Sequence, residues 1–140
     1  TITKIADLDA ALKAGAQFLV SPGTPPAFAD VLARAAVPVL PGCASVSEAM
    51  TLSARGFTVL KFFPAEASGG IAWLNAVAGP LPYVRFCPTG GIGAKNAASY
   101  LALPNVVAVG GSWVAPKDAI ASGDFKRITT LSKAAARLRK

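Results

Sequence analysis

One lysine, Lys61, lies in the apolar run LKFFPAE (residues 60–66), which otherwise has the composition of a buried strand. Side chains alternate along a strand, so we expect Lys61 and Phe63 on one face and Leu60 and Phe62 on the other. Burial lowers the pKa of an amine because it penalises the charged form, and a neutral amine can attack a carbonyl carbon. Lys61 is therefore a candidate Schiff-base nucleophile. The alternative is a lysine that reaches solvent from the end of its strand.

Two glycine-rich segments could bind an anion. They are Thr89-Gly90-Gly91 and Gly110-Gly111-Ser112, and each follows an apolar segment expected to be a strand. Backbone N–H groups in such loops bind anions, although glycine also serves any tight turn. An amine and an anion site at the same end of a sheet suit a phosphorylated carbonyl compound.

The remaining reactive residue types are few. The chain has no histidine, so proton transfer would use a carboxylate, a lysine, a tyrosine or water. Cys43 and Cys87 are far apart and lack the spacing of metal ligands, so we expect two buried free thiols. The sequence therefore predicts no metal site.

The composition predicts one domain over residues 1–140, because the chain is 53% hydrophobic and only 15% charged. No apolar stretch is long enough to span a membrane, and the N-terminus lacks the features of a signal peptide, so we expect a cytoplasmic protein without a membrane partner. The net charge of +7 is dispersed, which favours an anionic small molecule over nucleic acid. The basic cluster at the C-terminus is expected to end a solvated helix. Its members are Lys133, Arg137, Arg139 and Lys140.

Short apolar segments alternate with Ala-rich segments of helical spacing, which predicts an α/β fold with a parallel sheet and crossover helices. The expected strands are Gln17–Val20, Val37–Leu40, Thr58–Phe63, Tyr83–Cys87 and Val106–Val109. We expect Thr24 to be a helix N-cap, and Ser45 with Glu48 to form a capping box.

The position of the glycine loops indicates a (β/α)8 barrel, the TIM barrel, rather than a doubly wound sheet. In phosphate-binding barrels the phosphate lies after strands seven and eight. If the two glycine loops follow those strands, the chain supplies strands four to eight and the first three strands are missing. A whole barrel takes roughly 200 residues or more, which agrees with this count. Five strands alone would leave two open sheet edges.

Five short motifs resemble the 2-keto-3-deoxy-6-phosphogluconate (KDPG) and 4-hydroxy-2-oxoglutarate (KHG) aldolase family of the Entner–Doudoroff pathway. They occur in the family's order and spacing, and the resemblance extends over all 140 residues. The motifs are SPG (21–23), LPG (40–42), LKFFPAE (60–66), RFCPTGGI (85–92) and GGSW (110–113).

The resemblance implies a class I aldolase, a lyase that needs no cofactor, with a phosphorylated keto acid and pyruvate as ligands. It implies that Lys61 forms the Schiff base, that Phe63 packs beside the pyruvyl group and that Thr89 lines the pocket. It assigns phosphate binding to Gly90, Gly91, Gly111 and Ser112. It also matches Thr1 to a threonine that contacts the pyruvate carboxylate, and places Pro22 and Pro41 in the pocket wall. Family members form trimers, so a homotrimer is expected.

The sequence departs from the family in two residues. The family's general-base glutamate and its carboxylate-binding arginine lie on an earlier strand, and this sequence has no counterpart. Glu66 is the carboxylate nearest to Lys61 in sequence, but its place after Pro64 favours a role in the first turn of the next helix. Arg85 is expected near the bottom of the barrel, and Trp73 and Trp113 in the core or at a subunit interface.

Other functions remain open at this point. One is a sister specificity, a phosphogalactonate or 4-hydroxy-2-oxoglutarate aldolase that uses the same amine. The other, from a different class, is a non-catalytic truncated fragment that retains the anion site.

Overall fold

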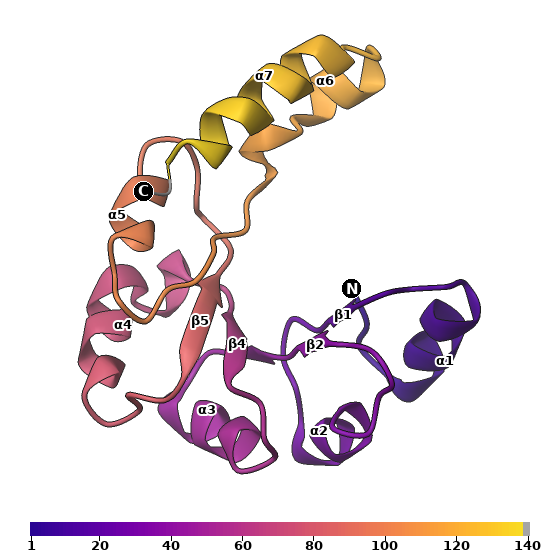
Figure 1. Ribbon diagram of the computed structural model, residues 1–140, viewed down its shortest axis with the longest axis vertical. Coiled ribbons are helices and arrows are strands. Elements are labelled where there is room, and N and C mark those ends of the chain that lie inside the picture. Colours follow the sequence, from indigo (N-terminus) through magenta and orange to yellow (C-terminus); the bar gives the residue numbers. More distant parts are fainter. Residues whose placement is uncertain (139–140) are drawn as a thin grey trace.

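Short parallel strands form the centre of the fold, and helices follow one another around their outer side (Figure 1). The computed structural model describes residues 1–138. β1 pairs with β2, and β4 lies between β3 and β5. The strands are β1 (Leu19–Val20), β2 (Val39–Leu40), β3 (Gly42–Cys43), β4 (Val59–Phe62) and β5 (Arg85–Pro88). The chain is therefore an α/β protein with parallel sheets, as the alternation of segments predicts.

The first α-helix precedes β1, and the others connect the strands or follow them. They are α1 (Ile5–Lys13), α2 (Pro26–Leu32), α3 (Val46–Ser53), α4 (Gly70–Ala78), α5 (Ala97–Leu101), α6 (Lys117–Ala121) and α7 (Phe125–Ala136). Two 3-10 helices, η1 (Glu66–Ser68) and η2 (Ser112–Val114), follow β4 and the second glycine loop.

The first four expected strands are confirmed in position, but the sequence analysis missed β3. Pro41 separates β2 from β3, because proline has no N–H with which to continue a ladder. The chain changes partner at this point. β2 pairs with β1, whereas Gly42 and Cys43 of β3 pair with Lys61 and Phe62 of β4.

The predicted fifth strand, Val106–Val109, is wrong. This segment makes only isolated bridges to the β5 side, between Phe86 and Val106 and between Thr89 and Gly110. The register advances by one residue between the two bridges, and Pro88, which lies between them on β5, has no N–H to donate. The ladder is therefore interrupted, although the Pro88 carbonyl still accepts a hydrogen bond of 2.9 Å from the Gly110 N–H.

One predicted helix start is confirmed and another is wrong. Ser45 caps α3, and the Glu48 carboxylate accepts hydrogen bonds from the Ala44 and Ser45 N–H groups, which completes the capping box. Thr24 does not cap α2, whose N-cap is Pro25. The Thr24 hydroxyl instead donates to the Gly42 carbonyl oxygen at 3.0 Å, because these two residues meet in the fold.

The hydrophobic core lies against one face of β4. Leu60 and Phe62 are fully buried, whereas Val59, Lys61 and Phe63 are only half-buried, so the predicted alternation of side chains is confirmed. Trp73 of α4 stacks on Phe62 with ring centroids 4.2 Å apart, which confirms Trp73 as a core residue. The face that carries Lys61 therefore points away from the helices that cover this core.

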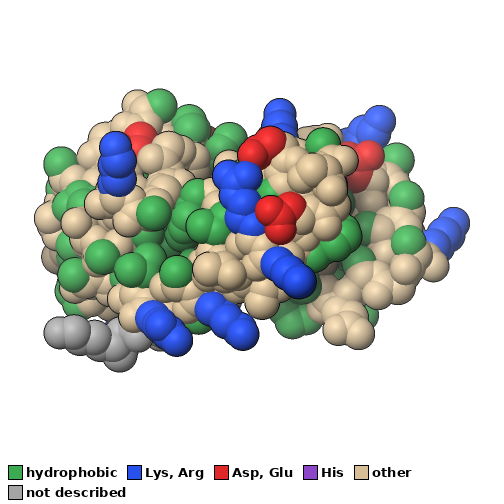
Figure 2. All heavy atoms as spheres, turned by 90° about the horizontal axis from the view of Figure 1, so that it is seen from above, with side chains coloured by type: hydrophobic (Ala, Val, Ile, Leu, Met, Phe, Trp, Pro, Cys, Tyr) green, Lys and Arg blue, Asp and Glu red, His purple; other side chains and the backbone are tan. Residues whose placement is uncertain are grey.

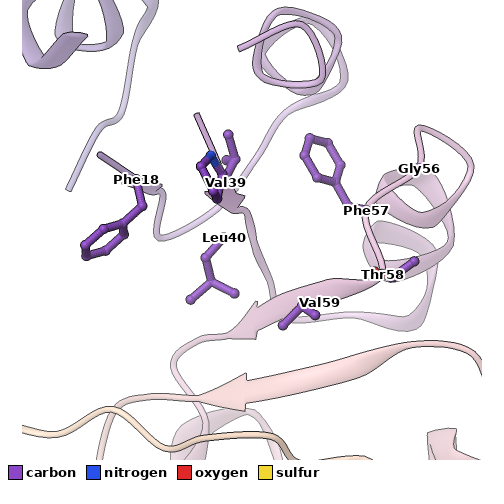
Figure 3. A pocket seen from close by; sticks show the side chains of 8 residues that line it. Phe18, Val39, Leu40, Gly56, Phe57, Thr58 and Val59 are labelled. Atoms are coloured by element: carbon purple, nitrogen blue, oxygen red, sulfur yellow. The ribbon is translucent and has the colours of Figure 1, made fainter. Parts of the chain in front are cut away.

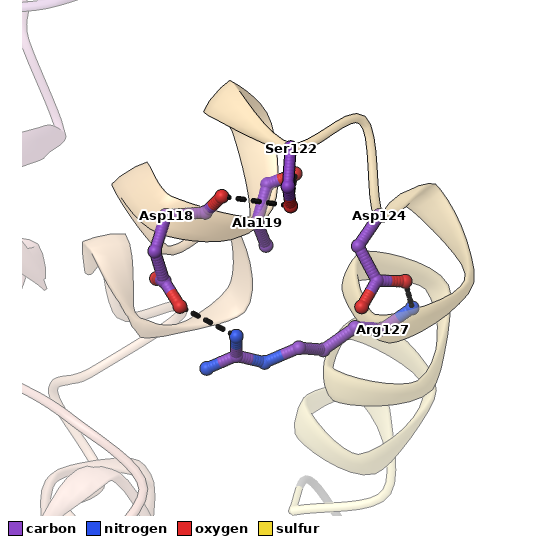
Figure 4. A network of polar contacts seen from close by, with 5 residues as sticks. All are labelled: Asp118, Ala119, Ser122, Asp124 and Arg127. Carbon is purple, nitrogen blue, oxygen red and sulfur yellow. Dashed lines mark hydrogen bonds and ion pairs between the residues drawn. The ribbon is translucent and has the colours of Figure 1, made fainter.

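The helices α6 and α7 project from the rest of the chain, and an ion pair joins them to each other (Figure 4). Asp118 and Arg127 form an ion pair of 2.6 Å, and the Asp124 carboxylate accepts a hydrogen bond from the Arg127 N–H. None of the residues of α7 is buried. Lys133 lies in the last turn of α7, as expected, whereas Arg139 and Lys140 of the predicted basic cluster lie outside the described residues.

Lysine and arginine side chains are scattered over the face shown in Figure 2. Within residues 1–138, no helix is both long enough and apolar enough to cross a membrane.

Candidate active site

Lys61 lies near the carboxyl end of β4, between two buried neighbours. Its N–H donates a hydrogen bond of 2.9 Å to the Pro41 carbonyl oxygen, which joins β4 to the LPG segment. Its register partners are Gly42 of β3 and Cys87 of β5. Because side chains in register on parallel strands share a face, the Lys61 amine and the Cys87 thiol lie on the same side of the sheet.

Burial lowers the pKa of the Lys61 amine below its ordinary value of 10.5, and the nearby Cys87 thiol acts in the opposite direction. The Lys61 Nζ also lies 4.7 Å from the centroid of the Phe63 ring, where an ammonium group interacts with the π-electrons. This contact favours the charged form, whereas burial favours the neutral form and so enlarges the nucleophilic fraction of the amine.

The loop after β5 is attached directly to the segment that follows Lys61. The Ala65 N–H donates to the Thr89 carbonyl oxygen at 2.9 Å, and the Glu66 N–H donates to the Gly90 carbonyl oxygen at 3.2 Å. The bridge between Thr89 and Gly110 brings the second glycine loop to the same place. The two glycine loops thus lie side by side at the end of the strands that carries Lys61, as the sequence predicts.

The N–H groups of Gly90, Gly91 and Gly111 donate no hydrogen bond to any other described residue. The φ angles of Gly90 (99°) and Gly91 (77°) lie in the left-handed region, which favours glycine. Unpaired N–H groups in adjacent loops are the groups that bind a phosphate or another small anion.

The SPG and LPG motifs also come together. The Gly42 N–H donates to the buried Ser21 hydroxyl oxygen at 3.2 Å, and the Ser21 N–H donates to the Leu40 carbonyl oxygen at 3.3 Å. Pro22 and Pro41 thus belong to neighbouring loops at the ends of β1 and β2. The sequence analysis names Ser21 only as part of the SPG motif and missed this contact of its hydroxyl group. The shared Pro-Gly endings of the two motifs are the signal that could have indicated it.

Thr1, the first residue of the chain, is exposed. The next residue, Ile2, is buried, and its N–H donates to the Val20 carbonyl oxygen at 2.9 Å. The first residues of the chain therefore run beside the carboxyl end of β1.

Glu66 starts η1, in agreement with its predicted place in a first helical turn, and its carboxylate accepts a hydrogen bond from the hydroxyl group of Tyr100 on α5. Arg85 is exposed and donates to the Pro82 carbonyl oxygen at 3.1 Å. Trp113 is partly buried and packs against the core. Tyr100 is a second residue that the sequence analysis missed.

Figure 3 shows a hollow that lies away from Lys61. It has a volume of about 420 Å³ and is lined by Phe18, Pro38, Val39, Leu40, Gly56, Phe57, Thr58 and Val59. These residues surround the amino ends of β2 and β4, opposite to the end that carries Lys61. Its lining has no amine, carboxylate or thiol, and it is separate from Lys61 and the two glycine loops. Within residues 1–138, no cluster of three His, Cys, Asp or Glu residues could hold a metal ion.

The comparisons with known proteins agree with this geometry. Residues 1–131 match the family described as KDPG and KHG aldolase. The chain is 47% identical over 135 residues to a 2-dehydro-3-deoxy-phosphogluconate aldolase from Dickeya dadantii. The matched region covers 96% of the chain and 63% of that relative. It therefore spans less than two thirds of the length of this relative.

Two solved structures are similar to the chain. One is KDPG aldolase from Legionella pneumophila with pyruvate captured as a covalent carbinolamine intermediate, with a TM-score of 0.91, 45% identity, and coverage of 93% of this chain and 63% of that one. The other is KDPG aldolase of Zymomonas mobilis with 3-phosphoglycerate, with a TM-score of 0.92, 38% identity, and coverage of 100% and 66%. The chain belongs to the KDPG and KHG aldolase family.

Proposed function

We propose that the chain carries the Schiff-base half of a class I aldolase that cleaves KDPG to pyruvate and glyceraldehyde 3-phosphate. One observation carries the proposal. The Lys61 amine lies on the uncovered face of β4 with a lowered pKa, and the loop that follows it is hydrogen-bonded to the Thr89-Gly90 segment. An amine and a loop able to bind an anion thus lie at the same end of the sheet, which supports a phosphorylated keto acid as the ligand.

The reaction starts when the Lys61 amine attacks the C2 ketone and forms a carbinolamine, which loses water to give a protonated imine. The imine accepts electrons, so removal of the proton from the C4 hydroxyl allows the C3–C4 bond to break. Glyceraldehyde 3-phosphate leaves, and the remaining enamine is protonated at C3. Water then hydrolyses the imine and releases pyruvate from Lys61. Each step balances without a metal or a redox cofactor.

The other residues have proposed binding roles. Phe63 and Thr89 would contact the pyruvyl group, and the free N–H groups of Gly90, Gly91 and Gly111, with Ser112, would bind the phosphate. Pro22 and Pro41 would shape the pocket wall, and Thr1 would contact the pyruvate carboxylate. The relatives with bound pyruvate and 3-phosphoglycerate support both halves of the proposed ligand.

The finer description of the fold is also part of the proposal. We propose that the chain supplies a TIM barrel from strand four onward, with the interrupted segment around Val106 in the place of strand eight. We further propose that the first three strands and the base that takes the C4 hydroxyl proton come from a part outside this sequence. The chain spans less than two thirds of its Dickeya relative, and the only carboxylate in LKFFPAE, Glu66, accepts a hydrogen bond from Tyr100. From the family resemblance we also propose a homotrimer. From the sequence, we propose a cytoplasmic location.

The test is a retro-aldol assay that follows pyruvate release from KDPG, from the corresponding phosphogalactonate and from 4-hydroxy-2-oxoglutarate. We expect little cleavage by the chain alone. Cleavage should appear when the part of the Dickeya relative that this chain does not match is supplied as a second polypeptide. Lys61→Met should abolish the restored activity, while Lys95→Met, on an exposed lysine, serves as the matched control. Full turnover by the unsupplemented chain would refute the proposed absence of the base.

The substrate panel also separates the alternatives. Preference for the phosphogalactonate or for 4-hydroxy-2-oxoglutarate would assign the sister specificity. A chain that binds inorganic phosphate but shows neither cleavage nor a pyruvate adduct, with or without the second polypeptide, would be a non-catalytic fragment.

A further inference from the structure

A buried tyrosine on α5 is hydrogen-bonded to the segment that follows Lys61. The Tyr100 side chain is fully buried, and its hydroxyl group donates to Oε1 of Glu66. The two residues are 34 positions apart, so this contact joins elements that are distant in the sequence. Burial and the Glu66 carboxylate both raise the pKa of Tyr100, which keeps the hydroxyl protonated and able to donate.

Glu66 in turn lies directly behind the first glycine loop. Its N–H donates to the Gly90 carbonyl oxygen at 3.2 Å. A Cβ atom on Gly91 would lie 2.5 Å from Cγ and 2.7 Å from Cβ of Glu66, so the stem of the glutamate fills the space beside that glycine. Glu66 therefore contacts the Gly90-Gly91 segment through both its backbone and its side chain, so a shift of Glu66 would alter the conformation of that segment.

The hydroxyl group of Tyr100 also has a close neighbour on its other side. A Cβ atom on Gly70 would lie 2.9 Å from that hydroxyl oxygen, so the first residue of α4 leaves just enough room for it. The hydroxyl thus lies between Glu66 and Gly70.

We propose that Glu66 and Tyr100 are positioning residues that hold the Gly90-Gly91 loop in the conformation that binds the phosphate end of the substrate. The inference rests on the proposed function and extends it to two residues that touch neither the ketone nor the phosphate. Loop N–H groups bind an anion best when they are held in place beforehand, because the free energy of ordering the loop is then not lost on binding. The carboxylate charge itself repels an anion, so Glu66 acts by geometry rather than by charge.

This distinction gives opposite expectations for two substitutions of the same residue. Glu66→Gln keeps an oxygen that accepts from Tyr100 and removes the negative charge, so the phosphate should bind as tightly as before or more tightly. Glu66→Ala removes the acceptor and the stem behind Gly91, so the phosphate should bind less tightly. Tyr100→Phe removes only the donor and should act like Glu66→Ala.

The experiment is a titration of the 140-residue chain with inorganic phosphate, followed by the amide NMR signals of Gly90 and Gly91. We expect Tyr100→Phe and Glu66→Ala to raise the dissociation constant roughly tenfold, as expected for the loss of a hydrogen bond to a charged group. Tyr83→Phe, which removes the hydroxyl of a tyrosine that is 59% exposed, is the matched control and should leave the constant unchanged. Exchange of the Ala65 and Glu66 amide hydrogens should accelerate in Tyr100→Phe, because these amides bond to the loop.

The inference is overturned if Tyr100→Phe and Glu66→Ala bind phosphate like the original chain. It is also overturned if Glu66→Gln weakens binding as much as Glu66→Ala, or if phosphate leaves the Gly90 and Gly91 signals of the original chain unmoved. Trapping of pyruvate on Lys61 with borohydride is measured in parallel and should stay within about twofold in all variants, because the bond lies on the phosphate side. Loss of that adduct in the original chain would instead count against the proposed function.

Discussion

Replacing Gly110 by alanine should separate the two glycine loops. A Cβ atom at this position would lie 2.7 Å from Oγ1 and 3.1 Å from Cγ2 of Thr89, both closer than ordinary van der Waals contact. The Thr89 side chain must rotate, or the bridge between Thr89 and Gly110 must open, and the hydrogen bond from the Gly110 N–H to the Pro88 carbonyl oxygen weakens with it.

The expected cost follows from this overlap. Overpacking of this kind destabilises a protein by about 1 to 3 kcal/mol. With a urea m-value of about 2 kcal/mol/M, a loss of about 2 kcal/mol lowers the unfolding midpoint by about 1 M.

Two further variants make the measurement specific. Gly79→Ala adds the same methyl group where no atom lies within 4 Å, so its midpoint should stay the same or rise slightly. The double variant Gly110→Ala with Thr89→Ala removes the overlapping atoms and should recover most of the lost stability. A midpoint of Gly110→Ala equal to that of Gly79→Ala, or no recovery in the double variant, would refute the reasoning.

Three more predictions concern the strand that carries Lys61 and its surroundings. Because burial lowers its pKa, the reaction rate of Lys61 with trinitrobenzenesulfonate should rise with pH and reach half of its maximum below pH 10.5; a half-maximum at or above 10.5 would contradict this. Phe62→Ala should reduce the free energy of unfolding in urea by about 3 to 5 kcal/mol, since it empties a fully buried site under Trp73. Ser45→Ala should reduce it by about 1 kcal/mol through the lost cap of α3; a reduction below 0.3 kcal/mol would show that the cap contributes little.

The sequence predicts local features of this fold well. The alternation of LKFFPAE identifies the buried and open faces of β4, because a strand has a fixed period of two. The capping box of Ser45 and Glu48 is also local, since its partners are three residues apart. Adjacency of the glycine loops follows from the order of parallel strands.

Features that depend on which elements meet could not be predicted from one sequence. The Thr24 hydroxyl could cap its own helix or bond to Gly42, and only the fold decides between them. The interruption of the segment around Val106 depends on Pro88, which lies on the neighbouring strand. The contact between Glu66 and Tyr100 spans two βα units, and neither residue carries a local signal for it.

The most direct test of the central claim is to incubate the chain with pyruvate and borohydride and to map the adduct by mass spectrometry. The account predicts a reduced pyruvate adduct on Lys61, weaker than in a full-length relative, and none in Lys61→Met. Absence of an adduct, or an adduct confined to other lysines, would contradict the assignment of Lys61 as the Schiff-base residue.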